Sequence, residues 1–134
     1  MYMTDRAGTS DRVFKTAWFS KAAKKAHLAD DELCSAIRQV MLGQAYDLGG
    51  GVFKKRLGKN LYRSIVLTKG RKFWVYEYLF AKKDRANIGD DELDGFRQLA
   101  KVYTQLSVQQ VDRLLRKKDW FEICIQGECH DDEA

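Results

Sequence analysis

Residues 52–87 read VFKKRLGKNLYRSIVLTKGRKFWVYEYLFAKKDRAN, and this stretch decides the fold. β-Branched and aromatic residues fill it, and turn residues divide it at Gly58 and Gly70. We therefore expect three consecutive antiparallel strands: 52–57, 60–67 and a third that ends at Ala81. The stretch holds eleven Lys or Arg against two acidic residues, whereas the other 98 residues carry a net charge of −4. This local charge predicts a surface for a polyanion, above all nucleic acid, with a solvated charged face as the plain alternative.

The expected hairpin register gives this sheet two different faces. Gly58-Lys59 suits a two-residue type II′ turn, which places Lys54 opposite Arg63, and the next turn places Arg63 opposite Glu77. Alternation then puts Lys54, Arg56 and Arg63 on one face. The other face, expected to pack on helices, carries the aromatic residues Phe53, Tyr62, Trp74, Tyr76, Tyr78 and Phe80. The like-charge Lys54–Arg63 pair is a conflict typical of functional sites, unless Arg63 and Glu77 simply form a structural ion pair.

The segment before the basic stretch predicts one strand and two helices. The strand covers 13–19, and Ser20 caps a short helix over 21–27. A second helix begins at Asp30, has an apolar stripe at helical spacing, and stops at Gly43. The glycine-rich connection 44–51 is expected to be the most mobile part of the interior of the chain.

The segment after the basic stretch predicts two more helices. One starts at Asp90 and runs to Leu106. Ser107 and Gln110 form a capping-box pattern for the other, over 108–118. The apolar run 120–125 is either a short strand or an irregular cover over the core. The pattern as a whole predicts an α+β fold: an antiparallel sheet, made of the N-terminal strand and the three-stranded meander, packed on the N-terminal helical hairpin.

Length and composition fit a single globular domain over 12–125 in a chain of 134 residues. Residues 1–11 are expected to be a flexible leader, and 126–134 a disordered acidic tail. Neither an export signal nor an apolar run long enough to span a membrane is seen, so a cytoplasmic protein is expected. The three cysteines, Cys34, Cys124 and Cys129, are an odd number, and we expect them to be reduced thiols.

Several kinds of catalytic site are poorly supported by the sequence. Cys124-x4-Cys129-His130 has ligand-type residues, but its spacing matches no common zinc site, so no metal and no other cofactor is expected. The histidines, His27 and His130, form no nucleophilic constellation with Ser or Cys. No glycine cluster has the pattern of a phosphate-binding loop.

The order of elements and the stretch FAKKDRANI, residues 80–88, followed by an acidic helix start, resemble the RelE-like toxins of bacterial type II toxin–antitoxin systems. The resemblance covers about residues 12–125 and is closest to the RelE/HigB branch of the RelE/ParE superfamily. It implies a toxin that cuts mRNA, without a metal and in many members on the ribosome. It also implies neutralisation by a cognate antitoxin and contact with operator DNA only through the antitoxin complex.

The resemblance assigns site residues to matching positions of this chain. The catalytic set that it implies is Lys54, Arg56, Arg63, Lys83 and Arg85. The basic residues Lys55, Lys59 and Lys82 would add to RNA binding. In this assignment Arg63 and Lys83 hold the reacting phosphate, Arg85 assists, Arg56 positions the RNA backbone, and Lys54 is the candidate base. Some relatives also use a Tyr or His near the edge of the site, where this chain has Asn87.

Two other functions remain open at this point. ParE-like relatives share the fold but bind DNA gyrase, so the chain could inhibit by protein binding. It could also be a non-catalytic nucleic-acid-binding co-repressor that acts with its antitoxin. The concentration of Lys and Arg on one sheet face favours RNA as the target.

Overall fold

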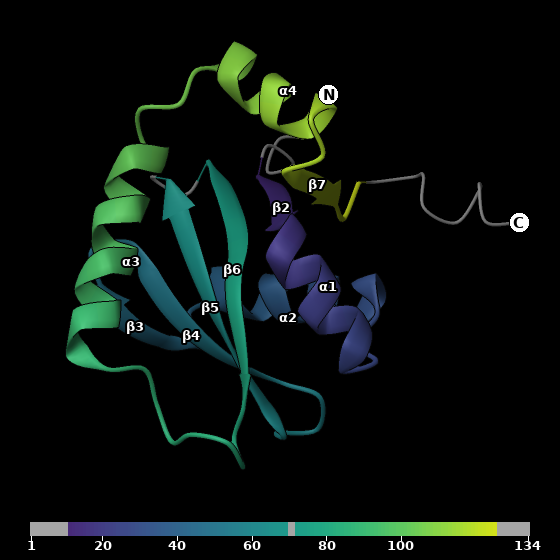
Figure 1. Ribbon diagram of the computed structural model, residues 1–134, viewed down its shortest axis with the longest axis vertical. Helices are drawn as coiled ribbons and strands as arrows, with labels where there is room; N and C mark the ends of the chain where they lie inside the picture. Colours follow the sequence, from purple (N-terminus) through teal and green to yellow (C-terminus); the bar gives the residue numbers. More distant parts are fainter. Residues whose placement is uncertain (1–10, 70–71, 126–134) are drawn as a thin grey trace, which may run out of the picture.

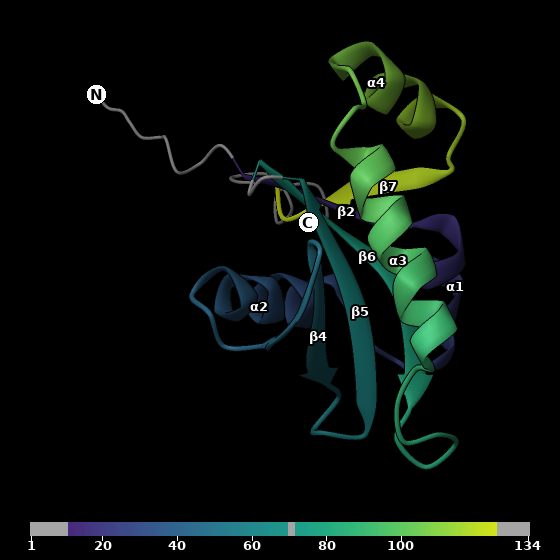
Figure 2. The same ribbon diagram turned by 90° about the vertical axis from the view of Figure 1, so that its left-hand side faces the viewer.

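The computed structural model describes residues 11–69 and 72–125, which form a central sheet with helices on both faces. The strands lie in the order β3-β4-β5-β6-β2-β7 (Figure 1). Helix α2 lies on one side of this sheet and α3 on the other (Figure 2). The predicted α+β class is confirmed. The sheet is mixed, however, because the N-terminal strand β2 pairs parallel to β6. Residues 1–10 of the leader expected over 1–11, and the acidic tail 126–134, lie outside the described residues.

Strand β2 (Arg12–Thr16) is shorter than predicted, and helix α1 (Ala17–Lys25) starts earlier. The reason is the N-cap, which is Thr16 and not Ser20: the Thr16 hydroxyl accepts a hydrogen bond from Phe19 N at 3.0 Å. Phe19 therefore lies on the helix, where it is fully buried and packs on Tyr76 with ring centres 4.9 Å apart. The aromatic residues Trp18 and Phe19 led to the prediction of a strand where the first turn of α1 lies.

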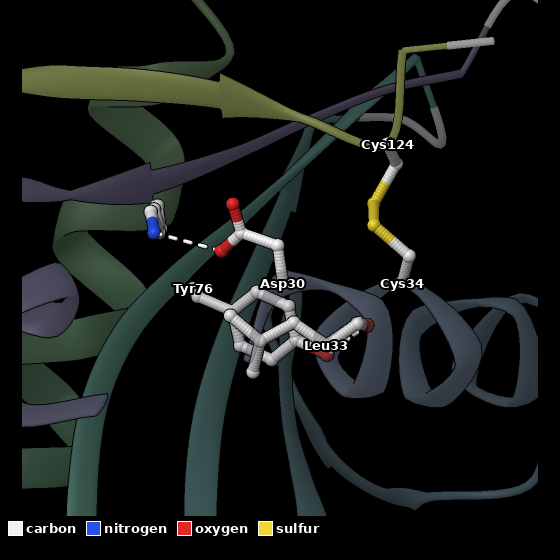
Figure 3. Close-up of a disulfide and its surroundings, with 6 residues drawn as sticks. Asp30, Leu33, Cys34, Tyr76 and Cys124 are labelled. Atoms are coloured by element: carbon white, nitrogen blue, oxygen red, sulfur yellow. Dashed lines mark hydrogen bonds and ion pairs between the residues drawn. A yellow bond between two sulfur atoms is a disulfide. The ribbon is translucent and has the colours of Figure 1, made fainter. Parts of the chain in front are cut away.

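Helix α2 (Asp30–Met41) starts and stops as predicted, with three acids in its first turn and Gly43 just beyond its end at φ +88°. Its buried stripe includes Leu33, Ile37 and Val40. This stripe packs in a core with Trp74 and Tyr76 from β6. The Tyr76 hydroxyl, fully buried, donates to the Leu33 carbonyl at 2.8 Å, which fixes the helix against the sheet (Figure 3).

Cys34 and Cys124 form a disulfide, with Cα atoms 5.5 Å apart (Figure 3). The prediction of three reduced thiols is therefore wrong for this pair. Cys34 lies on α2 and Cys124 directly follows the last strand, so the bond joins positions 90 residues apart in sequence. Spacing along the chain gave no sign of this proximity, because the fold creates it. Cys129 lies outside the described residues.

The connection expected to be mobile contains a strand. Strand β3 (Tyr46–Gly49) pairs antiparallel with β4 and forms one edge of the sheet. The glycines that suggested mobility make a tight turn, in which Gly49, Gly50 and Gly51 all have φ between +64° and +86°. A Cβ on Gly51 would come within 3.2 Å of the Thr68 carbonyl oxygen.

Strands β4 (Val52–Leu57) and β5 (Tyr62–Lys69) form the predicted hairpin, but in a different register. Lys54 lies opposite Ile65, and Arg56, not Lys54, lies opposite Arg63. The cause is the turn, which is two residues longer than a Gly58-Lys59 turn. Leu61 N donates to the Gly58 carbonyl, and Gly58, Lys59 and Asn60 all have positive φ.

Strand β6 (Phe73–Ala81) carries an irregularity that the sequence did not reveal. Ile65 pairs with Tyr78 and Val66 pairs with Tyr76, so Glu77 is an extra residue in a β-bulge. The bulge reverses the alternation. Tyr78 and Phe80 consequently belong to the core under α3, whereas they were expected on the side of the helical hairpin.

Arg63 lies opposite Phe80 and not opposite Glu77, so the predicted register is wrong and the alternative of an Arg63–Glu77 ion pair falls with it. Glu77 instead accepts a hydrogen bond of 2.7 Å from the Tyr103 hydroxyl of α3. Burial raises the pKa of Glu77, and the bond from Tyr103 opposes this shift.

The C-terminal elements are α3 (Asp90–Tyr103), α4 (Val108–Arg116) and β7 (Trp120–Ile123). Both helices start where predicted and end two or three residues earlier, and the Ser107–Gln110 capping box is present. Strand β7 pairs antiparallel with β2, which makes the last apolar run a strand and not an irregular cover. Helix α3 covers part of the second sheet face, in a core that includes Val52, Ile65, Leu67 and Val75.

Candidate nucleic-acid interface

The observed register brings three of the sequence-predicted basic residues onto the sheet face that α3 partly covers. One row across the strands reads Tyr46, Lys54, Ile65, Tyr78, and the next reads Arg56, Arg63, Phe80. Paired residues project from the same face of a sheet, so Lys54, Arg56 and Arg63 share one face. Like charges are still directly opposed, but at Arg56 and Arg63. Arg63 turns toward the hairpin end, where it donates to the carbonyls of Asn60 and Tyr62.

Tyr46 on edge strand β3 lies between two of these cations. Arg56 Nη2 donates to the Tyr46 hydroxyl at 3.1 Å. Lys54 Nζ lies 5.2 Å from the centre of the Tyr46 ring, and Arg56 Cζ lies 5.8 Å from it. The Tyr46 side chain is half exposed and, with Lys54 and Arg56, lines a shallow pocket of about 280 Å³. An aromatic face flanked by cations suits a nucleotide.

The loop after β6 joins this group through Asn87. Lys54 Nζ donates to Asn87 Oδ1 at 3.1 Å, and the Asn87 carbonyl accepts from Arg85 Nε at 3.0 Å. Asn87 thus holds the Lys54 ammonium in place from a segment 33 residues further along the chain. The sequence placed Asn87 near the edge of the site, but the Lys54–Asn87 contact depends on how the loop folds back.

Arg85 is strongly engaged within the protein. Its guanidinium makes a two-pronged ion pair with Glu92 in the first turn of α3, and it lies over the Phe80 ring at 5.6 Å. The Glu92 carboxylate also caps Gly89 N at 2.7 Å. The bond from Arg85 is the main cause that lowers the pKa of Glu92, and the same bond raises the pKa of Arg85. Arg85 therefore links the loop to the start of α3, besides any contact with a ligand.

The other predicted basic residues lie around this group. Lys55 projects from the opposite face, where it donates to the Gln44 carbonyl, and burial followed by the charge of Arg56 lowers its pKa. Lys59 is exposed at the tip of the β4–β5 turn, with φ +54°. Lys82 and Lys83 are exposed in the loop after β6, and Lys83 borders a second pocket, beside α1. The structure thus gathers Lys54, Arg56 and Arg63 on one face, with Arg85 linked to it through Asn87.

Sequence reasoning missed Tyr46. The available signal was an exposed aromatic residue in an otherwise small and polar connection, but the glycines led to the prediction of a mobile loop. Pairing with β4 is what brings Tyr46 beside Lys54, and such pairing is difficult to infer for a strand of four residues.

The charge on this face is not neutralised from within the protein. Among residues 11–69 and 72–125, no carboxylate pairs with Lys54, Arg56 or Arg63, whereas Arg12, Lys15, Arg85 and Arg97 all have carboxylate partners. Unpaired cations on a sheet face, with an aromatic ring between two of them, can bind a phosphodiester backbone and stabilise added negative charge. In the same part of the chain, no three His, Cys, Asp or Glu side chains are grouped to hold a metal ion.

The chain is thus a small α+β protein with basic side chains gathered on one face of its sheet. The family model described as the RelE toxin of the RelE/RelB toxin–antitoxin system matches residues 11–123. The chain therefore belongs to the RelE toxin family, and an antitoxin partner is implied. No curated protein and no solved structure gives a significant match. None of the described helices has the length and apolar character needed to cross a membrane.

Proposed function

We propose that this RelE-family protein is a metal-independent endoribonuclease that cuts mRNA, during translation, and so inhibits protein synthesis. The observation that carries the proposal is the shared face of Lys54, Arg56 and Arg63, three cations without a carboxylate partner in the described structure. A surface that only had to stay hydrated would gain from nearby carboxylates. A surface that receives RNA keeps its cations available for phosphates.

The reaction that these residues suit is transesterification. The RNA 2′-oxygen attacks the adjacent phosphorus, a bond from the 2′-oxygen to phosphorus forms, and the bond to the 5′-oxygen breaks. One product carries a 2′,3′-cyclic phosphate and the other a 5′-hydroxyl. A base must take the proton of the 2′-hydroxyl, an acid must protonate the leaving 5′-oxygen, and cations must stabilise the charged phosphorane.

The division of roles follows the family resemblance, and the structure adds the Lys54–Asn87 hydrogen bond to it. Arg63 and Lys83 hold the phosphate, Arg56 positions the backbone, Arg85 assists from the loop, and Lys54, oriented by Asn87, is the candidate base. The Tyr46 hydroxyl accepts a hydrogen bond from Arg56, so its own proton is free to point elsewhere. Tyr46 is therefore the candidate acid for the leaving group.

The test is RNA cleavage by purified variants, with and without translating ribosomes. Alanine at Lys54, Arg56 or Arg63 should lower the cleavage rate by about 10²–10⁴-fold while the fold is retained. Tyr46→Phe removes the hydroxyl and keeps the ring, so it tests the proposed role of the hydroxyl as the acid. Lys101→Ala, an exposed lysine on α3, is the matched control and should cut normally. Full activity of both Lys54→Ala and Arg63→Ala would overturn the proposal, and intact mRNA with halted DNA replication would point to gyrase.

The remaining parts of the proposal concern partners and place. The cognate antitoxin would neutralise the protein, and operator DNA would be contacted only through that complex. We assign the protein to the RelE/HigB branch on the FAKKDRANI stretch, and to the cytoplasm, where mRNA is translated. Co-purification of the product of the neighbouring gene would test the antitoxin assignment directly.

A further inference from the structure

A second cluster of aromatic and basic residues lies beside α1, outside the group around Lys54. Trp18, in the first turn of α1, stacks on Tyr78 of β6 with ring centres 5.1 Å apart and planes inclined by 22°. Trp18 is 53% exposed, whereas the other two tryptophans, Trp74 and Trp120, are only 1% and 4% exposed. One face of the Trp18 ring is thus covered by Tyr78, and much of the rest of the side chain is exposed to solvent.

The surface around Trp18 is hollow and basic. A pocket of about 590 Å³ is lined by Trp18, Tyr62 and Tyr78 and bordered by Lys21, Lys25 and Lys83. Its volume lies within the ~300–1,000 Å³ typical of small-ligand sites. Lys21 and Lys25 follow Trp18 by three and seven positions, which places all three on one side of the helix. Among the residues that the structure describes, Asp84 is the single acidic one that lines the pocket.

This pocket borders the proposed cleavage surface, which is the sheet face that carries Lys54, Arg56 and Arg63. Tyr78 stands in the same row of the sheet as Lys54, two strands away, which corresponds to about 10 Å. The Tyr78 hydroxyl also accepts a hydrogen bond from Arg85 Nη1 at 3.4 Å. Arg85 Nε donates to the Asn87 carbonyl, and the Asn87 side chain accepts from Lys54 Nζ. A single RNA strand that lies on the cleavage surface therefore reaches Trp18 within a few nucleotides.

We propose that the Trp18 pocket is a subsite for an unpaired nucleobase of the bound RNA, which stacks on the open face of Trp18 while its flanking phosphates meet Lys21 and Lys25. Proteins bind single strands by this combination of an aromatic platform and a basic groove. The inference rests on the proposed function for its ligand, but it concerns binding of a flanking nucleotide and not the chemical step.

The experiment uses Trp18 as its own reporter. The full-length protein is titrated with a 2′-O-methyl oligoribonucleotide of about 12 nucleotides, which cannot undergo the transesterification, while tryptophan emission is followed. The exposed Trp18 should be quenched on binding, and Trp18→Phe should remove the quenched signal, because Trp74 and Trp120 are buried. An abasic oligomer of equal length carries the same phosphates without bases, and should bind more weakly without quenching Trp18.

Variants give the affinities. Trp18→Ala should weaken binding of the 2′-O-methyl oligomer about tenfold or more, whereas Leu42→Ala, which truncates an exposed apolar residue at the end of α2, should leave it unchanged. Combined Lys21→Ala and Lys25→Ala should reduce the slope of log affinity against log salt by about 0.7 for each lysine. Circular dichroism and thermal melting report whether each variant is folded. If a variant is unfolded, the comparison of the 2′-O-methyl and abasic oligomers on the unsubstituted protein still decides the proposal.

The outcomes separate the two proposals. Quenching of Trp18 by the 2′-O-methyl oligomer, without cleavage of mRNA either free or on translating ribosomes, supports the subsite and contradicts the ribonuclease. Cleavage without quenching, or equal quenching by the abasic oligomer, overturns the subsite and leaves the ribonuclease standing. Quenching by an acidic polyglutamate peptide but not by the oligomer would also overturn it, and would make this pocket a protein-docking surface.

Discussion

Reduction of the Cys34–Cys124 disulfide should strongly destabilise the protein. The bond closes a loop of 90 residues. In the chain-entropy treatment, closing such a loop lowers the entropy of the unfolded chain and so raises its free energy by about 4.6 kcal/mol at 25 °C. A domain of this length unfolds with an entropy of about 2.1 cal/mol/K per residue, so this difference corresponds to a fall in Tm of about 16 °C. Since folded domains are stable by only about 5–15 kcal/mol, the bond supplies a large part of the total.

The assay is urea unfolding followed by far-UV circular dichroism, with and without a thiol reductant, beside the Cys34→Ser/Cys124→Ser double variant. The reduced protein and the double variant should show similar losses, and reductant should have no further effect on the double variant. Cys129 is kept in every sample, so that its contribution cancels. A difference below about 1 kcal/mol between oxidised and reduced protein would refute the loop-entropy reasoning for this bond.

Two further predictions concern residues outside the basic face. Thr16→Ala should lower the unfolding free energy by about 1 kcal/mol, because the cap of α1 is lost, whereas Ser20→Ala, at the cap expected from the sequence, should change it little; equal losses in urea unfolding would contradict the observed cap. Glu77→Gln should flatten the dependence of stability on pH. Burial raises the pKa of Glu77 above its ordinary value of 4.5, so its contribution to stability is greatest below that value and is lost as the pH rises above it. Urea unfolding between pH 4 and pH 7 should therefore show a smaller fall in the unfolding free energy for Glu77→Gln than for the unsubstituted protein. An unchanged pH profile would show that Glu77 does not titrate as the structure implies.

The features that the sequence predicted well are those with local causes. Acidic first turns start α2 and α3, Gly43 ends α2, and Ser107 with Gln110 begins α4. In each case the signal and the structure lie within a few residues of each other. The shared face of Lys54, Arg56 and Arg63 was also predicted correctly, because the β4–β5 turn is longer than expected by two residues, and an even shift in register leaves each side chain on the same face.

The features that were predicted wrongly depend on distant contacts or on small insertions. A turn two residues longer than expected moved the β4–β5 register, and one extra residue at Glu77 reversed the face of Tyr78 and Phe80. The contact of Cys34 with Cys124 exists only once α2 and β7 pack on the same sheet. These details do not change the fold class, but they decide which side chains meet at the candidate site.

The disulfide also changes what a protease can do to this protein. A single cut of the backbone anywhere between residues 34 and 124 leaves two pieces that remain covalently joined. Cleavage in the exposed loop after β6, for example, would leave one band in non-reducing gel electrophoresis and two bands after reduction. A nicked molecule would keep both halves of its sheet at high effective concentration, so limited proteolysis of the oxidised protein need not end with its dissociation.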